Sequence, residues 1–120
     1  PDIITADLSF ISLTKVFKPF FQLMKEHGDL ITLIKPQFEV GRSQVGKKGV
    51  VKDFSLHMEA INNIIINAKE HSFYTYNLTY SPIKGSKGNI EYLAHFKKNC
   101  KTDNLVNVKA VVEKSHAELF

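Results

Sequence analysis

The chain has 120 residues, of which 43% are hydrophobic and 23% are charged. This composition suits one modest domain with its own core and excludes a chain that is disordered throughout. No stretch approaches the roughly 20 consecutive apolar residues of a membrane helix, and PDIITADLSF at the N-terminus lacks the pattern of a signal peptide. A single cysteine, Cys100, excludes an internal disulfide framework. The sequence therefore predicts a soluble, cytoplasmic protein.

The formal charge is +4, and the basic residues gather in two segments. Residues 35–52 hold five basic side chains against one acidic side chain, and residues 84–101 also hold five against one. Such an excess favours contact with a polyanion. Solvated loops are often rich in lysine as well, so the charge alone does not decide between the two interpretations.

The first predicted elements are a strand and a helix. Residues 2–6, DIITA, form a short apolar run that Asp7 follows. Between 14 and 26, apolar residues recur at three- and four-residue spacings, so one face of a helix would be apolar. Pro19 is tolerable only near a first turn, which places the start of this helix around Ser12 to Lys15.

A buried strand, a long loop and a second helix come next. Residues 30–34, LITLI, are apolar without alternation, which is typical of a strand covered on both faces, as in parallel sheets. Lys35 ends this strand, and residues 36–52 are predicted to form a loop. A loop of roughly 17 residues in a compact domain is usually functional or disordered. Asp53 then suits the N-cap of a helix over 53–71.

The second half adds two strands and a last helix. Residues 73–79 and 90–96 are predicted strands, joined by the turn-rich SPIKGSKGN. The tail from Asp103 to Phe120 is predicted to be a helix capped by Asp103. The order strand, helix, strand, helix, strand, strand, helix indicates an α/β sheet with helices packed on its faces.

Three charged residues stand where strands end or begin. Asp7 closes the first strand, Lys35 closes the second, and Glu91 opens a later one. Ligands bind beyond the carboxyl ends of the strands in open α/β sheets, so these side chains could converge on one site. Each could equally be a turn former or a solvated residue. The five histidines show no metal-ligand spacing and are expected to be packing or surface residues.

Four longer motifs follow one another along the chain, and three of them carry these charged residues: DLSFISL at 7–13, LIKPQFEVGR at 33–42, VGKKGVVKD at 45–53 and SPIKGSKGNIEYL at 81–93. Together they resemble the methyltransferase domain of the TlyA family, which is often labelled haemolysin A and is related to FtsJ-type RNA ribose methyltransferases. The resemblance covers residues 2–97. It implies a Rossmann-like fold that uses S-adenosyl-L-methionine to methylate ribose 2′-hydroxyls of ribosomal RNA, with ribosomal RNA or ribosomal subunits as partners.

The resemblance also implies roles for the three charged residues. FtsJ-like enzymes are associated with a Lys-Asp-Lys-Glu tetrad, whose aspartate, second lysine and glutamate match Asp7, Lys35 and Glu91. Asp7 would in addition be a contact for the cofactor. The first lysine of the tetrad has no counterpart in this sequence. Beside two carboxylates, Lys35 is therefore expected to stay charged and to orient the ribose hydroxyl as a hydrogen-bond donor.

The resemblance also implies an RNA-binding role for the two basic segments. Arg42, Lys47 and Lys48 in the long loop, with Lys84 in the later turn, are predicted to contact phosphates, because affinity for nucleic acid rests largely on such cations. A flexible connection without a binding role is the alternative for the loop.

The cofactor-binding half of the family pattern is missing. Nothing in residues 1–120 looks like a glycine-rich cofactor loop after a first strand, or an acidic ribose contact after a second. We therefore expect a single partial domain, the C-terminal half of the methyltransferase sheet, that is inactive alone. Its strand at 2–6 would be an unpaired edge through which the fragment could self-associate.

Two functions from other classes stay open. The family label suggests a membrane-acting haemolysin, although the isoleucines of the helix at 53–71 fit burial against a sheet better than a membrane surface. A non-catalytic RNA-binding module would bind RNA with a clear salt dependence and would not respond to the cofactor.

Overall fold

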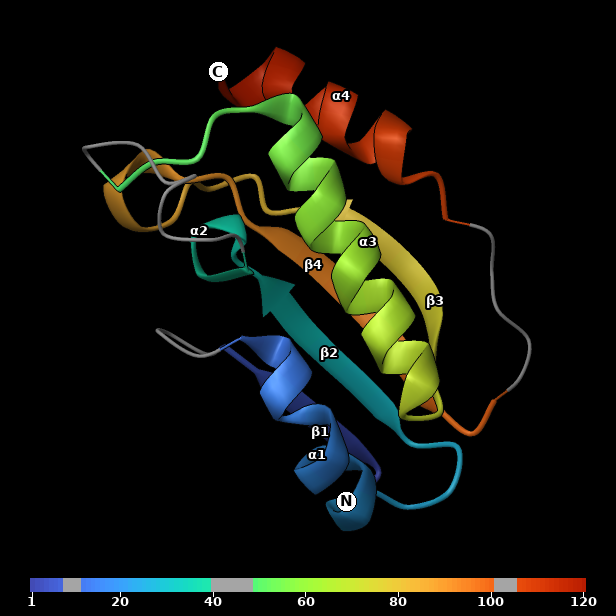
Figure 1. Cartoon of the computed structure of the whole chain (residues 1–120). Helices are drawn as coiled ribbons and strands as arrows, with labels where there is room; N and C mark the ends of the chain where they lie inside the picture. The colour runs from blue at the N-terminus through green and yellow to red at the C-terminus, as the bar shows by residue number, and fades with distance from the viewer. Residues whose placement is uncertain (8–11, 40–48, 101–105) are drawn as a thin grey trace.

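The computed structural model describes residues 1–7, 12–39, 49–100 and 106–120. Four strands form one mixed sheet in the order β1-β2-β4-β3 (Figure 1). The strands are β1 (Ile3–Ala6), β2 (Asp29–Ile34), β3 (Phe73–Tyr80) and β4 (Tyr92–Lys98). The helices are η1 (Leu13–Lys15), α1 (Phe17–Leu23), α2 (Pro36–Glu39), α3 (Phe54–Glu70), η3 (Ser86–Gly88) and α4 (Val108–Leu119). The predicted α/β fold with helices on a sheet is confirmed.

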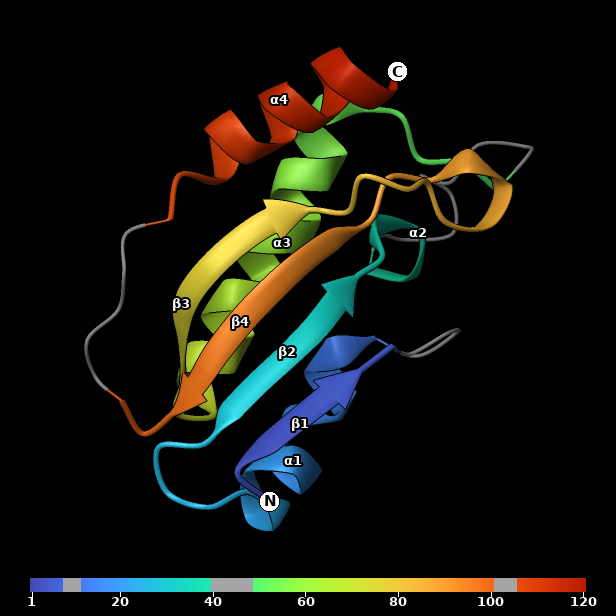
Figure 2. The same ribbon diagram turned by 180° about the vertical axis from the view of Figure 1, so that it is seen from behind.

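The helices α1, α3 and α4 lie on one face of this sheet. Figure 2 shows the other face, with none of these helices in front of the strands. The core fills the space between the sheet and those helices. Burial alternates along β4, so that every second side chain joins the core. The largest buried side chains are Tyr92, Phe17, Phe73, Phe96, Leu30, Ile34, Ile61 and Ile64.

The surroundings of β2 differ from the prediction of a strand covered on both faces of a parallel sheet. β1 pairs with β2 in parallel, but β4 pairs with β2 antiparallel, with Ile34 opposite Tyr92. On the open face, Ile31 remains 36% exposed. The prediction of a strand covered on both faces was wrong, because Ile31 and Leu33 lie on the face that the described helices leave uncovered.

The predicted boundaries of α3 are confirmed. The Asp53 carboxylate accepts a hydrogen bond from the Ser55 backbone N–H at 2.8 Å, which is the expected N-cap. The inward face of the helix buries Ala60, Ile61 and Ile64 against the sheet. Within the described residues, no helix combines the length and apolar character needed to cross a membrane.

Two other helices begin elsewhere than predicted. α1 begins at Phe17, after η1, with Pro19 in its first turn as proline requires. α4 begins at Val108, and its N-cap is Asn107, whose side chain accepts from the Ala110 N–H at 3.0 Å. The predicted cap, Asp103, lies outside the described residues.

The buried lysine Lys98 serves the end of α1. Its side chain is 8% exposed, and its ammonium donates to the carbonyl oxygens of Phe21 and Met24 at 2.6 and 2.7 Å. The Phe21 ring centroid lies 4.1 Å from the same nitrogen, and the Glu26 carboxylate lies 3.8 Å away. A cation therefore satisfies carbonyls that the helix cannot bond internally.

Replacing Lys98 by methionine should lower the free energy of unfolding by about 1.5–3 kcal/mol, because two carbonyls lose a charged donor in a buried place. Urea unfolding of the variant measures the change. The control is Lys109→Met on α4, where the lysine side chain is 67% exposed, and it should change stability by about 0.5 kcal/mol or less. Equal effects of the two substitutions would contradict the capping role of Lys98.

A buried polar network joins α3, β4 and α4. His57 Nε2 lies 2.7 Å from the Val51 carbonyl oxygen, which can only accept, so Nε2 carries a hydrogen. His57 Nδ1 lies 2.9 Å from both the Tyr92 hydroxyl and His116 Nε2. Tyr92 also contacts Ser115 Oγ at 2.9 Å, and burial raises the pKa of Tyr92 to about 12. Burial lowers the pKa of His57, an effect that His116 reinforces.

This network predicts a loss of stability in acid. Because the folded pKa of His57 lies below 6.5, the unfolded chain binds a proton near that pH while the folded chain does not. The free energy of unfolding should therefore fall as the pH drops below 6.5, and His116 acts in the same direction. Urea unfolding at about pH 7.5 and about pH 5.5 measures the loss. His57→Gln should reduce the difference, whereas His27→Gln, at an exposed position, should not.

Candidate active site

The sheet topology brings Asp7, Lys35 and Glu91 to one edge. Asp7 and Lys35 each follow a strand, and those strands, β1 and β2, run parallel, so both residues lie at the carboxyl end. Glu91 precedes β4, which runs antiparallel to β2, with Tyr92 opposite Ile34. The start of one strand therefore meets the end of the other, next to α2 (Figure 1).

Lys35 lies between the two carboxylates. Its ammonium is 2.5 Å from Asp7 Oδ1 and 3.9 Å from Glu91 Oε2. The side chains of Lys35 and Glu91 are 12% and 11% exposed, whereas Asp7 is 62% exposed. The structure thus brings together the three residues that the strand ends singled out, and their catalytic role stays a prediction.

Burial dominates the electrostatics of Glu91. It raises the pKa of this carboxyl above its usual 4.5, Lys35 opposes the shift, and the negative charge of Asp7 adds to it. Burial therefore makes the Glu91 carboxylate a stronger base than an exposed carboxylate. The Lys35 ammonium lies beside it. Its position depends on Gly85, because a Cβ on Gly85 would lie 2.0 Å from Glu91 Oε2.

Sequence reasoning missed several residues that shape this edge. α2 was not predicted, although proline is favoured at the first position of a helix, as Pro36 is here. Ser12 Oγ donates to Glu39 Oε1 at 2.5 Å, which ties the segment after β1 to α2. The Asn89 side chain bonds the backbone near Val51. These contacts could not be predicted from the sequence, because a serine or asparagine in a turn carries no spacing signal.

The residues predicted to bind RNA are only partly placed. Arg42, Lys47 and Lys48 lie outside the described residues. Lys84 is exposed, with its ammonium 5.1 Å from the centroid of the Phe120 ring. An exposed lysine resting on an aromatic ring can still meet a phosphate, and the RNA contact of these four residues stays a prediction.

The predicted cofactor contact Asp7 lies at the sheet edge, where its side chain is 62% exposed, and a carboxylate there would suit the sulfonium cation of S-adenosylmethionine. Of the described glycines near this edge, Gly85 lies against Glu91 and Gly49 lies against the Lys87 side chain, whereas a Cβ at Gly88 would meet open space. Among the described residues, nothing resembles a glycine-rich cradle for the rest of the cofactor.

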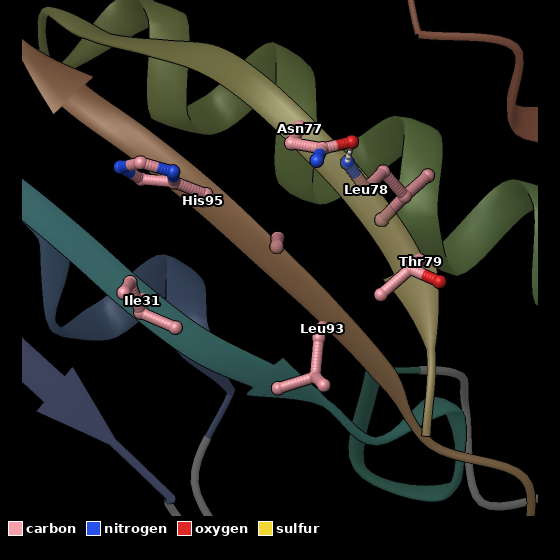
Figure 3. Close-up of a pocket in the computed structure, with 7 residues that line it drawn as sticks. Ile31, Asn77, Leu78, Thr79, Leu93 and His95 are labelled. Carbon is pink, nitrogen blue, oxygen red and sulfur yellow. Dashed lines mark hydrogen bonds between the residues drawn. The ribbon is translucent and has the colours of Figure 1, made fainter. Parts of the chain in front are cut away.

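A separate hollow lies on the open face of the sheet. It is lined by Ile31, Asn77, Leu78, Thr79, Leu93, Ala94 and His95 (Figure 3). Two of its polar atoms have partners: the Asn77 amide oxygen accepts from the Leu78 N–H at 2.8 Å, and His95 Nε2 lies 2.7 Å from Asp29 Oδ1. The hollow does not include Asp7, Lys35 or Glu91, so it is not part of the candidate active site.

A family model described as FtsJ-like methyltransferase matches residues 1–98, which include all three charged residues. The chain belongs to the FtsJ-like methyltransferase family. This part of an FtsJ-like domain therefore forms the mixed sheet described above, with its helices on one face.

Curated relatives carry two kinds of name. Hemolysin A of Brachyspira hyodysenteriae is 47% identical over 96 residues, which cover 80% of this chain and 40% of that protein. The 16S/23S rRNA (cytidine-2'-O)-methyltransferase TlyA of Mycobacterium tuberculosis is 35% identical over 115 residues, which cover 96% of this chain and 42% of that protein. The chain therefore spans about two fifths of the length of these relatives.

Solved structures agree on the fold. A protein from Lactococcus lactis described as a hemolysin superposes with a TM-score of 0.91 at 38% identity, over 96% of this chain and 56% of that one. A protein from Streptococcus thermophilus with the same description gives a TM-score of 0.93 at 37% identity, over 98% and 43%. The FtsJ-like fold of the chain thus matches about half of each larger structure.

The raised pKa of Glu91 predicts that Glu91→Gln stabilises the fold near neutral pH. A carboxyl whose folded pKa exceeds 4.5 opposes folding as the pH rises above that value. The variant should therefore melt at a higher temperature than the wild type near neutral pH, and the difference should shrink toward pH 4.5. A lower melting temperature in the variant would show that the carboxylate is on balance stabilising.

Lys35→Met should act in the opposite direction, because it leaves the buried Glu91 carboxyl without its neighbouring cation. The loss in melting temperature should be smaller when Glu91→Gln is already present. Thermal melts of the wild type, both single variants and the double variant measure this coupling. If the two changes simply add, the ammonium and the Glu91 carboxylate do not interact significantly.

Proposed function

We propose that the chain is part of an S-adenosylmethionine-dependent methyltransferase that acts on ribose 2′-hydroxyls of ribosomal RNA. The observation that carries the proposal is the ammonium of Lys35, held between the carboxylates of Asp7 and Glu91 where strands meet at the sheet edge. Family membership and the names of relatives that methylate ribosomal RNA support the same reaction.

The reaction requires a hydroxyl to be oriented and to lose its proton. When bound, the cofactor supplies an electrophilic methyl group. The Lys35 ammonium has three hydrogens, so it can donate to Asp7 and still donate to a ribose oxygen, which sets the direction of attack. As the O–CH3 bond forms, the methyl group would leave the cofactor's sulfur as a neutral thioether, and the proton of the hydroxyl would pass to a carboxylate. Glu91 suits this task, because burial raises its pKa above the usual 4.5 and makes it a stronger base.

The proposal concerns a protein longer than this chain. The described residues offer the reacting side of a site and no cradle for the cofactor nucleoside, so the 120-residue chain should not transfer methyl groups alone. In the full-length protein the substrate would be ribosomal RNA, reached in the cytoplasm, with Arg42, Lys47, Lys48 and Lys84 contacting its phosphates.

In the full-length protein, Lys35→Ala should reduce methyl transfer by about hundredfold or more, because the hydroxyl loses its orienting donor. Transfer of labelled methyl from S-adenosylmethionine to ribosomal subunits measures the loss. Lys114→Ala, an exposed position on α4, serves as the matched control and should retain activity. A Lys35→Ala variant that is folded and as active as the control would refute the role given to Lys35.

A further inference from the structure

The turn between β3 and β4 is held in a defined shape by its own hydrogen bonds. The Ser81 N–H donates to the Glu91 carbonyl oxygen at 2.8 Å, at the base of the turn. Further along, the Gly85 N–H donates to the Asn89 carbonyl at 2.7 Å, and the Gly88 N–H donates to the Gly85 carbonyl at 3.1 Å. The side chains of this turn therefore start from a fixed backbone.

One large apolar side chain of the turn points into solvent. Ile83 is 76% exposed, the highest value among the large hydrophobic residues that the structure describes. Its backbone is held by Ser81, whose hydroxyl donates to the Ile83 carbonyl at 3.0 Å and lies 3.3 Å from the Ile83 nitrogen. An apolar side chain that is fixed in water loses the stabilisation that burial would give. Contact with a ligand would recover it.

A cation and a second exposed apolar group lie beside Ile83 in the fold. The ammonium of Lys84, the next residue, is 5.1 Å from the centroid of the Phe120 ring, which is 45% exposed. Phe120 is itself held, because its N–H donates to the His116 carbonyl at 3.2 Å and its ring lies 5.0 Å from the His116 ring. We call Ile83, Lys84 and Phe120 the turn surface. A single exposed isoleucine is ordinary, whereas grouped apolar residues mark binding sites.

The turn surface lies beside the candidate active site. Gly85 directly follows Lys84, and a Cβ on Gly85 would lie 2.0 Å from Glu91 Oε2. That oxygen is 3.9 Å from the Lys35 ammonium. Figures 1 and 2 both place the turn next to α2, which begins directly after Lys35. A ligand on the turn surface would therefore be a neighbour of a substrate at Glu91 and Lys35.

The charge of the turn indicates which kind of ligand fits. Residues 81–90 contain Lys84 and Lys87 and no acidic side chain, and both lysines are exposed. Such a surface attracts anions. A nucleotide joins a planar base, which packs on aromatic and apolar side chains, to a phosphate, which pairs with a lysine. A nucleotide therefore suits all three members of the turn surface.

We propose that the turn surface binds the nucleotide next to the methylated one in the RNA substrate. Its base packs on Ile83 and Phe120, and its phosphate meets the Lys84 ammonium. This inference rests on the proposed function. It deepens that function, because a neighbouring nucleotide held on the turn fixes the RNA strand so that the target ribose reaches Lys35 and Glu91.

Tryptophan fluorescence in the full-length protein tests the base contact. This chain contains no tryptophan, so Ile83→Trp adds a signal that the unmodified protein lacks at this place. The control is Ile66→Trp on α3, where the isoleucine is 58% exposed. Ribosomal subunits should quench the emission of Ile83→Trp, because a base stacks on the indole, and should leave that of Ile66→Trp unchanged. A blue shift without quenching would indicate a protein surface instead and would overturn the proposal.

Kinetics and salt dependence test the same surface without a new fluorophore. Ile83→Ser should raise KM for ribosomal subunits by about fivefold or more, because the base loses its apolar contact. Ile83→Phe should keep KM, since a ring also stacks on a base, and Ile66→Ser serves as the control. Melting curves should be unchanged in all three, because both positions are exposed.

The phosphate contact is measured separately. Lys84→Gln should reduce the slope of log affinity against log salt concentration by about 1. Lys109→Gln, where the lysine side chain is 67% exposed on α4, should leave the slope unchanged. Equal slopes for the two variants would refute the phosphate contact of Lys84.

The outcomes separate the turn surface from the proposed function. If the wild type transfers no methyl group, or if Lys35→Ala is fully active, the proposed function fails and the place given to the nucleotide fails with it. If the wild type is active and Lys35→Ala is not, the turn surface alone is tested. It is then overturned if subunits do not quench Ile83→Trp, or if Ile83→Ser has the same KM as Ile66→Ser.

Discussion

The antiparallel register between β2 and β4 determines where each charged group of the site lies. Because Ile34 stands opposite Tyr92, the residue that follows one strand comes next to the residue that precedes the other. Lys35 and Glu91 are therefore neighbours by backbone pairing, before any side chain is considered. Parallel pairing of β1 with β2 then brings Asp7 to the same edge. The hydrogen-bonded ladder thus brings the three charges together, and the side chains adjust only the final distances.

The cost of this arrangement falls on Glu91. A carboxylate taken out of water is disfavoured, and the neighbouring ammonium offsets only part of the penalty, so the pKa stays raised. The turn accepts the carboxylate because Gly85 has no side chain. Such a site gives up some stability for a stronger base, which is a common property of residues that handle protons.

Much of the architecture was predictable because it follows from local patterns. The helical period and the Asp53 cap located α3, and turn-rich residues separated β3 from β4. The direction of β4 was not predictable, since an apolar strand carries no signal of its polarity relative to its neighbours. The exposure of Ile31 was missed for a related reason: an apolar residue on an uncovered face resembles one in a core.

The candidate site was predictable in part for a similar reason. Charged residues next to strands, carried in motifs that resemble a known family, singled out Asp7, Lys35 and Glu91. Contacts that depend on tertiary structure escaped, above all those of Asn89, whose partners lie far away in the sequence. The basic residues also differ in burial, which a count of charges does not reveal. Lys98 is buried as a helix cap, whereas Lys84 is exposed.

The position of β4 has a consequence for the order in which the site forms. β4 is the last of the described strands along the sequence, yet it lies between β2 and β3 in the sheet. Until β4 inserts, β3 lacks the strand with which it pairs, and Glu91 has no fixed place. The complete cluster of Asp7, Lys35 and Glu91 therefore requires contacts between residues far apart in the sequence, and such contacts form slowly. During synthesis, a ribosome would have to release nearly all of this chain before the site existed.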